Sequence, residues 1–315
     1  MRTRSAFALA VGAALALAGG DLALDPAAIG APPSANPTPA PGGGSPQCAV
    51  APAPGSRTVQ YTVDDRTLNV LVHVPPGLAA GSHVPLLIAL HGFRGDGPAM
   101  ERGTGFSALA DRQRFVVAYP SAPGGQWAIY AGEPRAKSDL DFVRTTIDQL
   151  STSLCIDRRR RFVVGVSNGA GEVARVGCLL ADRLAGVAPV AGDYRSLPTC
   201  HPPRPISIME IHGVRDPVVP FRGRSVDHSG AVPSFVATWR TLDHCGRSVS
   251  RSRAGPHSAR LTWHCAGHTM VSQVKLYDAG HVWPGSPAPG HVPGPESAAS
   301  VIWRFFSGLR QRGQF

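Results

Sequence analysis

The sequence predicts an α/β fold in which a mostly parallel, doubly wound sheet is flanked by helices and has antiparallel strands at its N-terminal edge. Stretches in which apolar residues recur three and four apart, at 138–154 and 172–184, lie between short apolar runs. Strand and helix therefore alternate, which implies crossover connections. The apolar runs are rich in Val, Ile and Leu, as strands buried on both faces of a sheet are. They occupy residues 84–90, 115–119, 162–166, 186–190, 206–211 and 271–277.

A hairpin and a closing helix complete the expected order of elements. Residues 57–63 and 67–74 alternate apolar and polar side chains on either side of 64–66, which is typical of two half-exposed antiparallel strands. Residues 296–309 place large apolar side chains on one side and predict a final helix. In such a sheet the functional residues gather at the carboxyl ends of the strands.

The first 46 residues are predicted to lie outside the folded domain. Residues 1–18 have a basic start, an apolar run and the small-x-small site 16–18, which predicts an export signal cleaved near Ala18. The run is too short to span a bilayer, and Gly20 stands where a lipoprotein would carry its lipidated Cys. No stable membrane anchor is therefore expected. Residues 19–46 are rich in Pro, Ala and Gly and predict a flexible spacer, which leaves 47–315 as one domain.

The six cysteines are expected to form disulfides. An even number in an exported chain favours bridges, and no pair has the C-x-x-C spacing of a zinc site, so no metal is expected. The number of cysteines alone permits about 15 connectivities. Short separations favour the pairs Cys178 with Cys200 and Cys245 with Cys265, leaving Cys48 with Cys155.

The formal net charge of +10 comes from scattered arginines, including the run 158–161. The chain lacks the stacking aromatics and motifs of a nucleic-acid-binding module, so nucleic acid is not the expected partner. Two interpretations of the charge stay open. It is either a solvated basic surface or a source of salt-sensitive attraction to anionic envelope or plant-wall polymers. We expect a monomer.

The pattern G-x-S-x-G at residues 165–169 predicts a serine nucleophile at Ser167. The bare pattern is weak in a chain with 36 glycines, where an ordinary Gly-Ser loop is the alternative. Its context is more specific, because it follows a predicted strand and opens a helix near Gly169, as a nucleophile elbow does. Glycine on both sides of the serine suits a strained turn with close backbone neighbours.

The predicted strand 84–90 leads into an expected oxyanion site. In α/β hydrolases one oxyanion N–H group follows this strand and the other belongs to the residue after the nucleophile. The sequence therefore nominates the backbone amides of Phe93 and Asn168. His91 precedes the serine and is expected to hold this loop rather than to act as the base.

The acid and the base should follow the serine in that order. Asp216 lies on a tight loop after the predicted strand 206–211, and Asp193, after the preceding strand, is the alternative acid. His281 lies between the last strand and the last helix, where the base is expected. His291 has a similar position but lies deep in a Pro/Gly-rich loop, and His212 precedes the acid and is expected to be a structural partner near the site.

These residues predict an acyl-enzyme mechanism that needs no cofactor. His281 takes the proton of Ser167, Asp216 fixes the histidine tautomer, and water then attacks the acyl-enzyme.

The motifs resemble the poly(3-hydroxybutyrate) depolymerase-like family of secreted esterases, which includes feruloyl esterases of carbohydrate esterase family 1. The similarity covers most of residues 57–315, and its most specific part is the Trp-Pro-Gly tail after His281. The matching segments are 91–93, 165–169, 188–192, 212–220 and 280–285.

The resemblance implies an α/β-hydrolase fold, the roles already given to Ser167, Asp216 and His281, and ester substrates such as feruloylated xylan or hydroxyalkanoates. Family members often carry Gly-Gly before the histidine, where this chain has Ala279-Gly280, and no additional polymer-binding domain is evident. Soluble esters are therefore expected rather than a crystalline polymer.

Several assignments keep an alternative. Trp127 and Trp283 are candidates to stack on an aromatic acyl group or a sugar, and buried packing is the alternative for each. Asp139 and Asp141 open a long predicted helix, where their charges favour its dipole. A peptidase with the same triad, and a non-catalytic envelope-binding protein on the same scaffold, are the competing functions.

Overall fold

A computed structural model of the chain describes residues 51–130, 132–194, 200–224, 230–286 and 297–311, all within a unit that spans Gly44–Phe315. The predicted export signal and spacer, Cys48 and His291 lie outside the described residues. No helix in the described ranges is long and apolar enough to cross a membrane.

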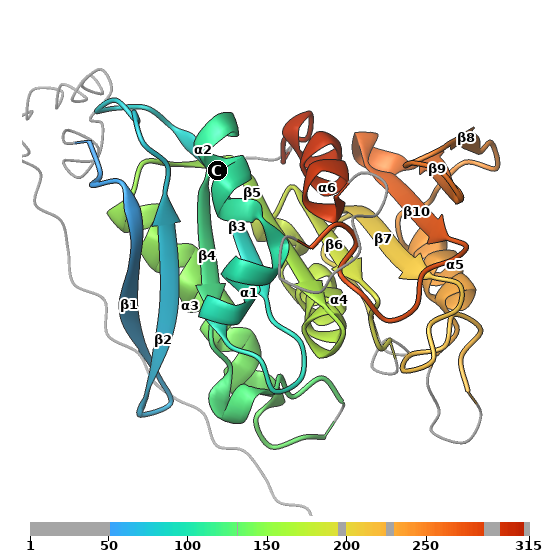
Figure 1. Cartoon of the computed structure of the whole chain (residues 1–315), viewed down its shortest axis with the longest axis horizontal. Helices are drawn as coiled ribbons and strands as arrows, with labels where there is room; N and C mark the ends of the chain where they lie inside the picture. Colours follow the sequence, from blue (N-terminus) through green and yellow to red (C-terminus); the bar gives the residue numbers. More distant parts are fainter. Residues whose placement is uncertain (1–50, 131, 195–199, 225–229, 287–296, 312–315) are drawn as a thin grey trace, which may run out of the picture. The chain divides into compact units, whose positions relative to one another are not determined.

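The described strands form a single ten-stranded sheet in the order β1-β2-β4-β3-β5-β6-β7-β10-β9-β8 (Figure 1). The strands are β1 (Gly55–Val63), β2 (Arg66–Val74), β3 (Val84–Leu90), β4 (Val116–Pro120), β5 (Ile156–Val166), β6 (Gly186–Val190), β7 (Ser207–Gly213), β8 (Ser250–Ser252), β9 (Ser258–His264) and β10 (Met270–Leu276). The helices are α1 (Gly97–Thr104), α2 (Phe106–Gln113), α3 (Ala136–Ser153), α4 (Asn168–Leu179), α5 (Val232–Leu242) and α6 (Ala298–Ser307), with short 3₁₀ turns η2 (Pro123–Gly125), η3 (Ala181–Arg183) and η4 (Ala266–His268).

The centre of the sheet is parallel from β4 through β3, β5, β6 and β7 to β10. At one edge β1 and β2 are antiparallel, and their hairpin turns at Asp64 and Asp65, which both have positive φ, as a tight two-residue turn requires. The predicted fold class is confirmed. The structure adds a second antiparallel edge, formed by β9 and β8, which the sequence did not predict.

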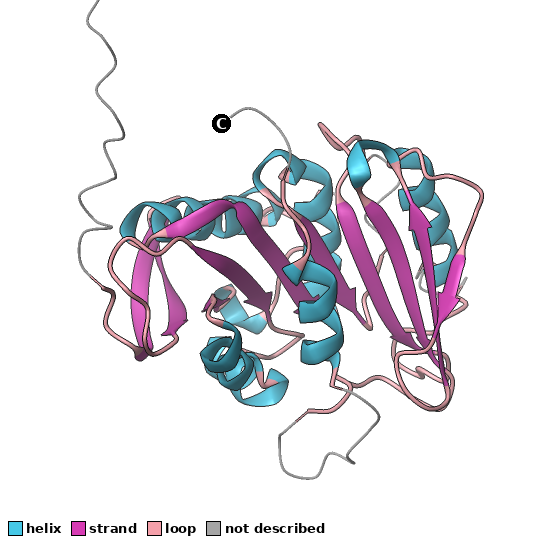
Figure 2. Cartoon of the chain, turned by 90° about the horizontal axis from the view of Figure 1, so that it is seen from above, coloured by secondary structure: helices cyan, strands magenta, loops and turns pink. Residues whose placement is uncertain are grey.

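Two layers of helices bury the two faces of the sheet (Figure 2). Alternate residues of β3 belong to different hydrophobic clusters, because successive side chains in a strand point to opposite faces. The cluster that contains Leu86 and Ile88 includes residues of α3, α4 and α5. The cluster that contains Leu87 and Ala89 includes residues of α1, α2 and α6. Both faces of the parallel strands are therefore covered, and the loops at their carboxyl ends stay available for a site.

Two of the predicted disulfides are confirmed. Cys178 near the end of α4 is bonded to Cys200, before β7, and Cys245 after α5 is bonded to Cys265, directly after β9. The third predicted bridge, from Cys48 to Cys155, involves a residue that the structure does not describe.

Candidate active site

Ser167 lies in a sharp turn between β5 and α4. Its φ of 55° and ψ of −119° form a conformation that costs about 1–3 kcal/mol for a residue with a side chain. A Cβ atom at Gly169 would lie 2.3 Å from the carbonyl oxygen of His91, and one at Gly165 would lie 2.6 Å from that of Gly169. The two glycines thus let α4 start directly against the ends of β3 and β5, which places the serine hydroxyl at the edge of the sheet.

Three residues that are far apart in the sequence form one chain of hydrogen bonds. The Oγ atom of Ser167 lies 2.9 Å from Nε2 of His281, and Nδ1 of His281 lies 2.8 Å from Oδ2 of Asp216. Asp216 follows β7 and His281 follows β10, and these two strands are parallel neighbours. The structure therefore brings together the predicted nucleophile, base and acid.

Asp216 is surrounded by hydrogen-bond donors. Its Oδ1 accepts from the backbone N–H groups of Val218 and Val219, both at 2.8 Å, and its Oδ2 lies 3.3 Å from Nε2 of His212 in addition to its contact with His281. Burial raises the pKa of Asp216, but the hydrogen bonds from His212, His281 and the Val219 N–H outweigh burial and lower that pKa. The carboxylate is therefore ionised and accepts from Nδ1–H of His281, so Nε2 is free to accept the serine proton.

Asp193, the alternative acid, has a different partner. Its Oδ2 accepts a hydrogen bond of 3.0 Å from the hydroxyl of Tyr130. Because Nδ1 of His281 already donates to Asp216, the geometry favours Asp216 as the acid.

The buried side chain of His212 lies behind Asp216, as expected. Its Nε2 donates to the carbonyl oxygen of Val219 at 2.8 Å, and its Nδ1 lies 3.0 Å from Oε1 of Glu210, which also accepts from the hydroxyl of Tyr194. Burial lowers the pKa of His212, but hydrogen bonds to Asp216 and Glu210, with the charge of Glu210, raise it to about 10. Glu210 was not predicted from the sequence, although Glu and His two residues apart on one strand share a face.

Two backbone amides beside the serine are available to a ligand. The loop after β3 passes close to Ser167, since a Cβ at Gly92 would lie 3.4 Å from Cβ of that residue. Within the described ranges, the backbone N–H groups of Phe93 and Asn168 donate to no protein acceptor. His91 holds this loop, as expected, because its Nδ1 donates to the carbonyl of Gly92 and its Nε2 accepts from the N–H of Ala122.

The side chain of Asn168 has a role that the sequence did not reveal. Its Oδ1 accepts from the backbone N–H of Trp127 at 2.8 Å, and its Nδ2 donates to the carbonyl of the same residue at 3.0 Å. The Trp127 ring is fully buried and donates from Nε1 to the carbonyl of His91. This pair of hydrogen bonds joins the nucleophile turn to the loop before α3.

Neither candidate stacking ring presents an open face. Trp127 is 0% exposed and packs against Phe142, and Trp283 is 7% exposed and meets Phe106 edge to face. Both rings therefore pack in the interior. Asp139 is also buried, and it accepts from the backbone N–H of Ala128, a contact beyond its predicted effect on the helix dipole.

Exposed apolar side chains instead flank the site. Phe93, Val218 and Val282 are 57%, 56% and 40% exposed. Phe93 is in the loop after β3, Val218 is two residues after Asp216, and Val282 directly follows His281. We call these three residues the apolar rim.

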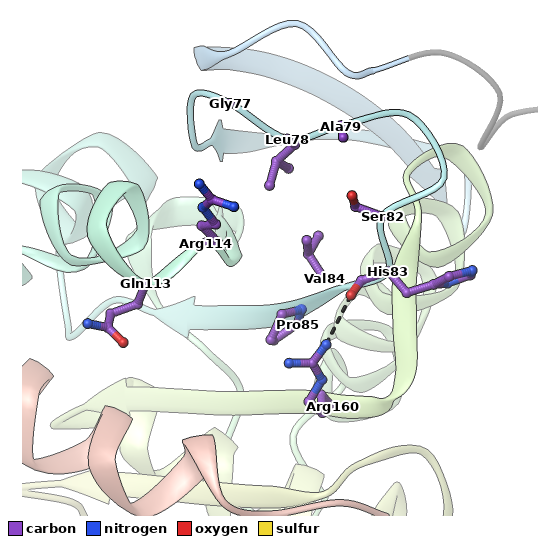
Figure 3. Close-up of a pocket in the computed structure, with 10 residues that line it drawn as sticks. All are labelled: Gly77, Leu78, Ala79, Ser82, His83, Val84, Pro85, Gln113, Arg114 and Arg160. Carbon is purple, nitrogen blue, oxygen red and sulfur yellow. Dashed lines mark hydrogen bonds between the residues drawn. The ribbon is translucent and has the colours of Figure 1, made fainter.

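A cavity of about 300 Å³ lies elsewhere in the molecule (Figure 3). It is lined by Val84 and Pro85 at the start of β3, with Arg114 and Arg160 on its sides. The seven residues of β3 separate this cavity from the loop that reaches Ser167, a length of about 20 Å at about 3.3 Å per residue. It is therefore separate from the candidate active site. Among the described residues, no group of His, Cys, Asp and Glu could hold a metal ion.

The strand order and the loops at the carboxyl edge of the sheet define an α/β-hydrolase fold. A solved acetyl xylan esterase from Aspergillus awamori has the same fold, with a TM-score of 0.61 at 15% identity, over 80% of this chain and 99% of that one.

The family described as esterase PHB depolymerase matches residues 68–229, and the chain belongs to it. The chain is 30% identical over 259 residues to NocK of Nocardia uniformis subsp. tsuyamanensis, named as an esterase, covering 73% of this chain and 74% of that protein. It is 27% identical over 228 residues to feruloyl esterase B of Piromyces equi, covering 67% of this chain and 42% of that protein. The resemblance inferred from the motifs is thereby confirmed, and the chain is a carboxylic ester hydrolase.

Proposed function

We propose that the chain is an exported serine carboxylesterase in which Ser167 is the nucleophile, His281 the general base and Asp216 the acid. The observation that carries this proposal is the continuous relay of hydrogen bonds, 2.9 Å from serine to histidine and 2.8 Å from histidine to aspartate. The serine hydroxyl faces the nitrogen that accepts its proton, and the other imidazole nitrogen faces the carboxylate that orients the ring.

In the first half of the reaction, Oγ of Ser167 attacks the ester carbonyl carbon while its proton passes to Nε2 of His281. The backbone N–H groups of Phe93 and Asn168 donate to the oxygen that becomes negatively charged. His281 then gives its proton to the leaving alcohol oxygen, the C–O bond breaks, and an acyl-enzyme remains. Asp216 stabilises the imidazolium throughout.

In the second half, water replaces the alcohol and gives a proton to His281 as it attacks the acyl carbon. The tetrahedral intermediate collapses, the carboxylic acid leaves, and the proton returns to Ser167.

Feruloyl or related polysaccharide esters are the proposed substrates. The apolar rim supports this choice, because an aromatic acyl group can lie on exposed Phe93 and Val282 beside the serine. The likeness to a feruloyl esterase supports it as well. Hydroxyalkanoate oligomers are the second candidate, favoured by the family to which the chain belongs.

Export belongs to the same proposal. Residues 1–18 serve as the export signal and 19–46 as a spacer before the catalytic domain of 47–315. The two disulfides support an oxidising destination.

The proposal is tested by Ser167→Ala together with a substrate panel. The variant should lose hydrolysis of p-nitrophenyl acetate and labelling by a fluorophosphonate probe, while its thermal melting temperature stays unchanged. The wild type should turn over methyl ferulate faster than hydroxybutyrate or long-chain acyl esters. Turnover of peptides without turnover of esters, or full activity of the variant, would show that the proposal is wrong.

A further inference from the structure

One segment of the chain has a strongly one-sided charge. Residues 244–277 contain no Asp or Glu, whereas the whole chain has 21. The segment carries positive charges whose sum is half of the chain's net charge of +10. They are those of Arg247, Arg251, Arg253, Arg260 and Lys275.

Three of these arginines lie along the outermost strand of the sheet. Arg251 is in β8, and Arg247 and Arg253 lie just before and just after it. All three are exposed, and none of their side chains forms an ion pair or a hydrogen bond with the residues that the structure describes. Arg251 and Arg253 lie about 7 Å apart along an extended chain. We call these three residues the arginine edge.

Some other arginines are paired with acids. Arg160 lies 2.6 Å from Asp157, and Arg144 lies 2.8 Å from Asp141. These pairs largely cancel each other's field at a distance, whereas the charges of the arginine edge add. Because residues 244–277 contain no Asp or Glu, the arginine edge is a local source of positive potential.

The arginine edge leads toward the candidate active site. Strands β8 and β10 run in the same direction, because each is antiparallel to β9 (Figure 1). The loop after β8 is joined to the loop that carries the base. The backbone N–H of Tyr277 donates to the carbonyl of His257 at 2.9 Å, and His257 pairs with Asp278 at 3.2 Å. His281 is only three residues further along the chain.

We propose that the arginine edge is a docking surface for a polysaccharide that carries carboxylate groups, such as a polyuronide, and that it brings esters on that chain to Ser167. This inference rests on the proposed function. Guanidinium groups bind carboxylates in a planar, two-pronged geometry. A row of them along a strand suits a polymer with repeated carboxylates better than a single small anion.

The surroundings favour a polysaccharide over single-stranded nucleic acid or a membrane. Single-stranded nucleic acid is held by several stacked aromatic side chains, and membrane surfaces are held by inserted apolar ones. Within residues 244–277, which the structure describes, Tyr277 is the one large hydrophobic side chain that is exposed. Trp263 is buried, and the guanidinium of Arg240 lies over its ring. Arginines on an edge strand also prevent two sheets from pairing edge to edge, and the experiment must separate that role from docking.

Binding is measured in the Ser167→Ala background, so that the result does not depend on turnover. The test variant is Arg247→Gln/Arg251→Gln/Arg253→Gln. The matched control removes three exposed arginines that have no ion pair in the described ranges: Arg102→Gln/Arg112→Gln/Arg158→Gln. Both variants lower the net charge by three. The probes are polygalacturonate, neutral arabinoxylan, duplex DNA and phosphatidylserine vesicles, each at low and high NaCl concentration.

The Kd for polygalacturonate should rise about tenfold or more in the test variant, at about two- to fivefold for each exposed contact, and less than about threefold in the control. Added salt should weaken wild-type binding. With Ser167 intact, the test variant should hydrolyse p-nitrophenyl acetate at the wild-type rate, and its KM should rise only for esters on uronate-bearing chains.

The proposal is overturned by equal losses in the two variants, by unchanged binding in the test variant, or by tighter binding of DNA or vesicles than of polygalacturonate at the same ionic strength. Self-association of the test variant with unchanged polygalacturonate binding would assign the arginines to edge protection alone. Failure of the proposed esterase would appear separately, as a lack of p-nitrophenyl acetate hydrolysis in the protein with Ser167 intact.

Discussion

Replacement of Asp216 by Asn gives the sharpest test of the hydrogen-bond relay. An amide NH₂ group needs acceptors, but both oxygens of Asp216 face donors, two backbone N–H groups on one side and His281 and His212 on the other. If the NH₂ group faces His281, the imidazole must place its proton on Nε2 and can no longer accept the proton of Ser167. We expect kcat to fall about 10⁴-fold, which corresponds to about 5.5 kcal/mol of transition-state stabilisation.

The assay is steady-state hydrolysis of p-nitrophenyl acetate, with thermal melting as the check on folding. The matched control is Asp193→Asn, because an amide oxygen can still accept the hydrogen bond from Tyr130. The control should keep kcat within about tenfold of wild type, since it leaves the relay intact. If Asp193→Asn loses more activity than Asp216→Asn, the assignment of the acid is refuted.

Three further outcomes concern stability. The pKa of His212 is raised from 6.5 to about 10 in the folded chain, so its stabilisation is complete below pH 6.5 and is lost as the pH rises toward 10. At about 1.4 kcal/mol for each of about 3.5 pKa steps, the loss is on the order of 5 kcal/mol, and urea unfolding of His212→Gln should depend less on pH over that range. Gly169→Ala places a Cβ 2.3 Å from a backbone oxygen and should cost about 1–3 kcal/mol, whereas Gly103→Ala has open space and should keep the wild-type melting temperature. Replacing Cys178 and Cys200, which are 22 residues apart, by Ser should lower the free energy of unfolding by about 3 kcal/mol.

The parallel centre of the sheet could be predicted because strands buried on both faces are continuous apolar runs in the sequence. The predicted runs 84–90 and 186–190 match β3 and β6 in full. The prediction for β5 found only 162–166, since the strand begins at Ile156 and its first half carries exposed arginines. Apolar composition thus locates the buried part of a strand and not its extension beyond the core.

Elements outside that centre left weaker signals. The strands β8 and β9 contain Ser, Arg and Thr because they lie at an edge and are only partly covered. Helix α5 was not predicted, although its sequence carries a signal: Val232, Phe235, Val236 and Trp239 recur at helical spacing and are buried. The helices α1 and α2 have only eight residues each, too few for a clear periodicity.

The candidate site was predictable where topology alone determines proximity. Ser167, Asp216 and His281 each follow a parallel strand, so their meeting at one edge follows from the fold. Contacts that depend on packing were not predictable. The side chain of Asn168 reaches Trp127 only because the loop before α3 folds over the nucleophile turn, and the burial of that ring is decided by its neighbours in space.

Because β7 pairs directly with β10, the spacing of Asp216 and His281 does not depend on the outer strands β9 and β8. The spacing between the acid and the base depends on this pair of adjacent strands, whereas α5, β8 and β9 all lie in the chain that leaves β7 and returns at β10. The exposed side chains of β8 lie on the outermost strand, beyond β9 and β10, and can be recharged while β7 and β10 stay in register. In our proposals the triad lies at the carboxyl ends of central strands and the polymer-binding arginines lie along the outermost strand, so variation at the arginines need not disturb the triad.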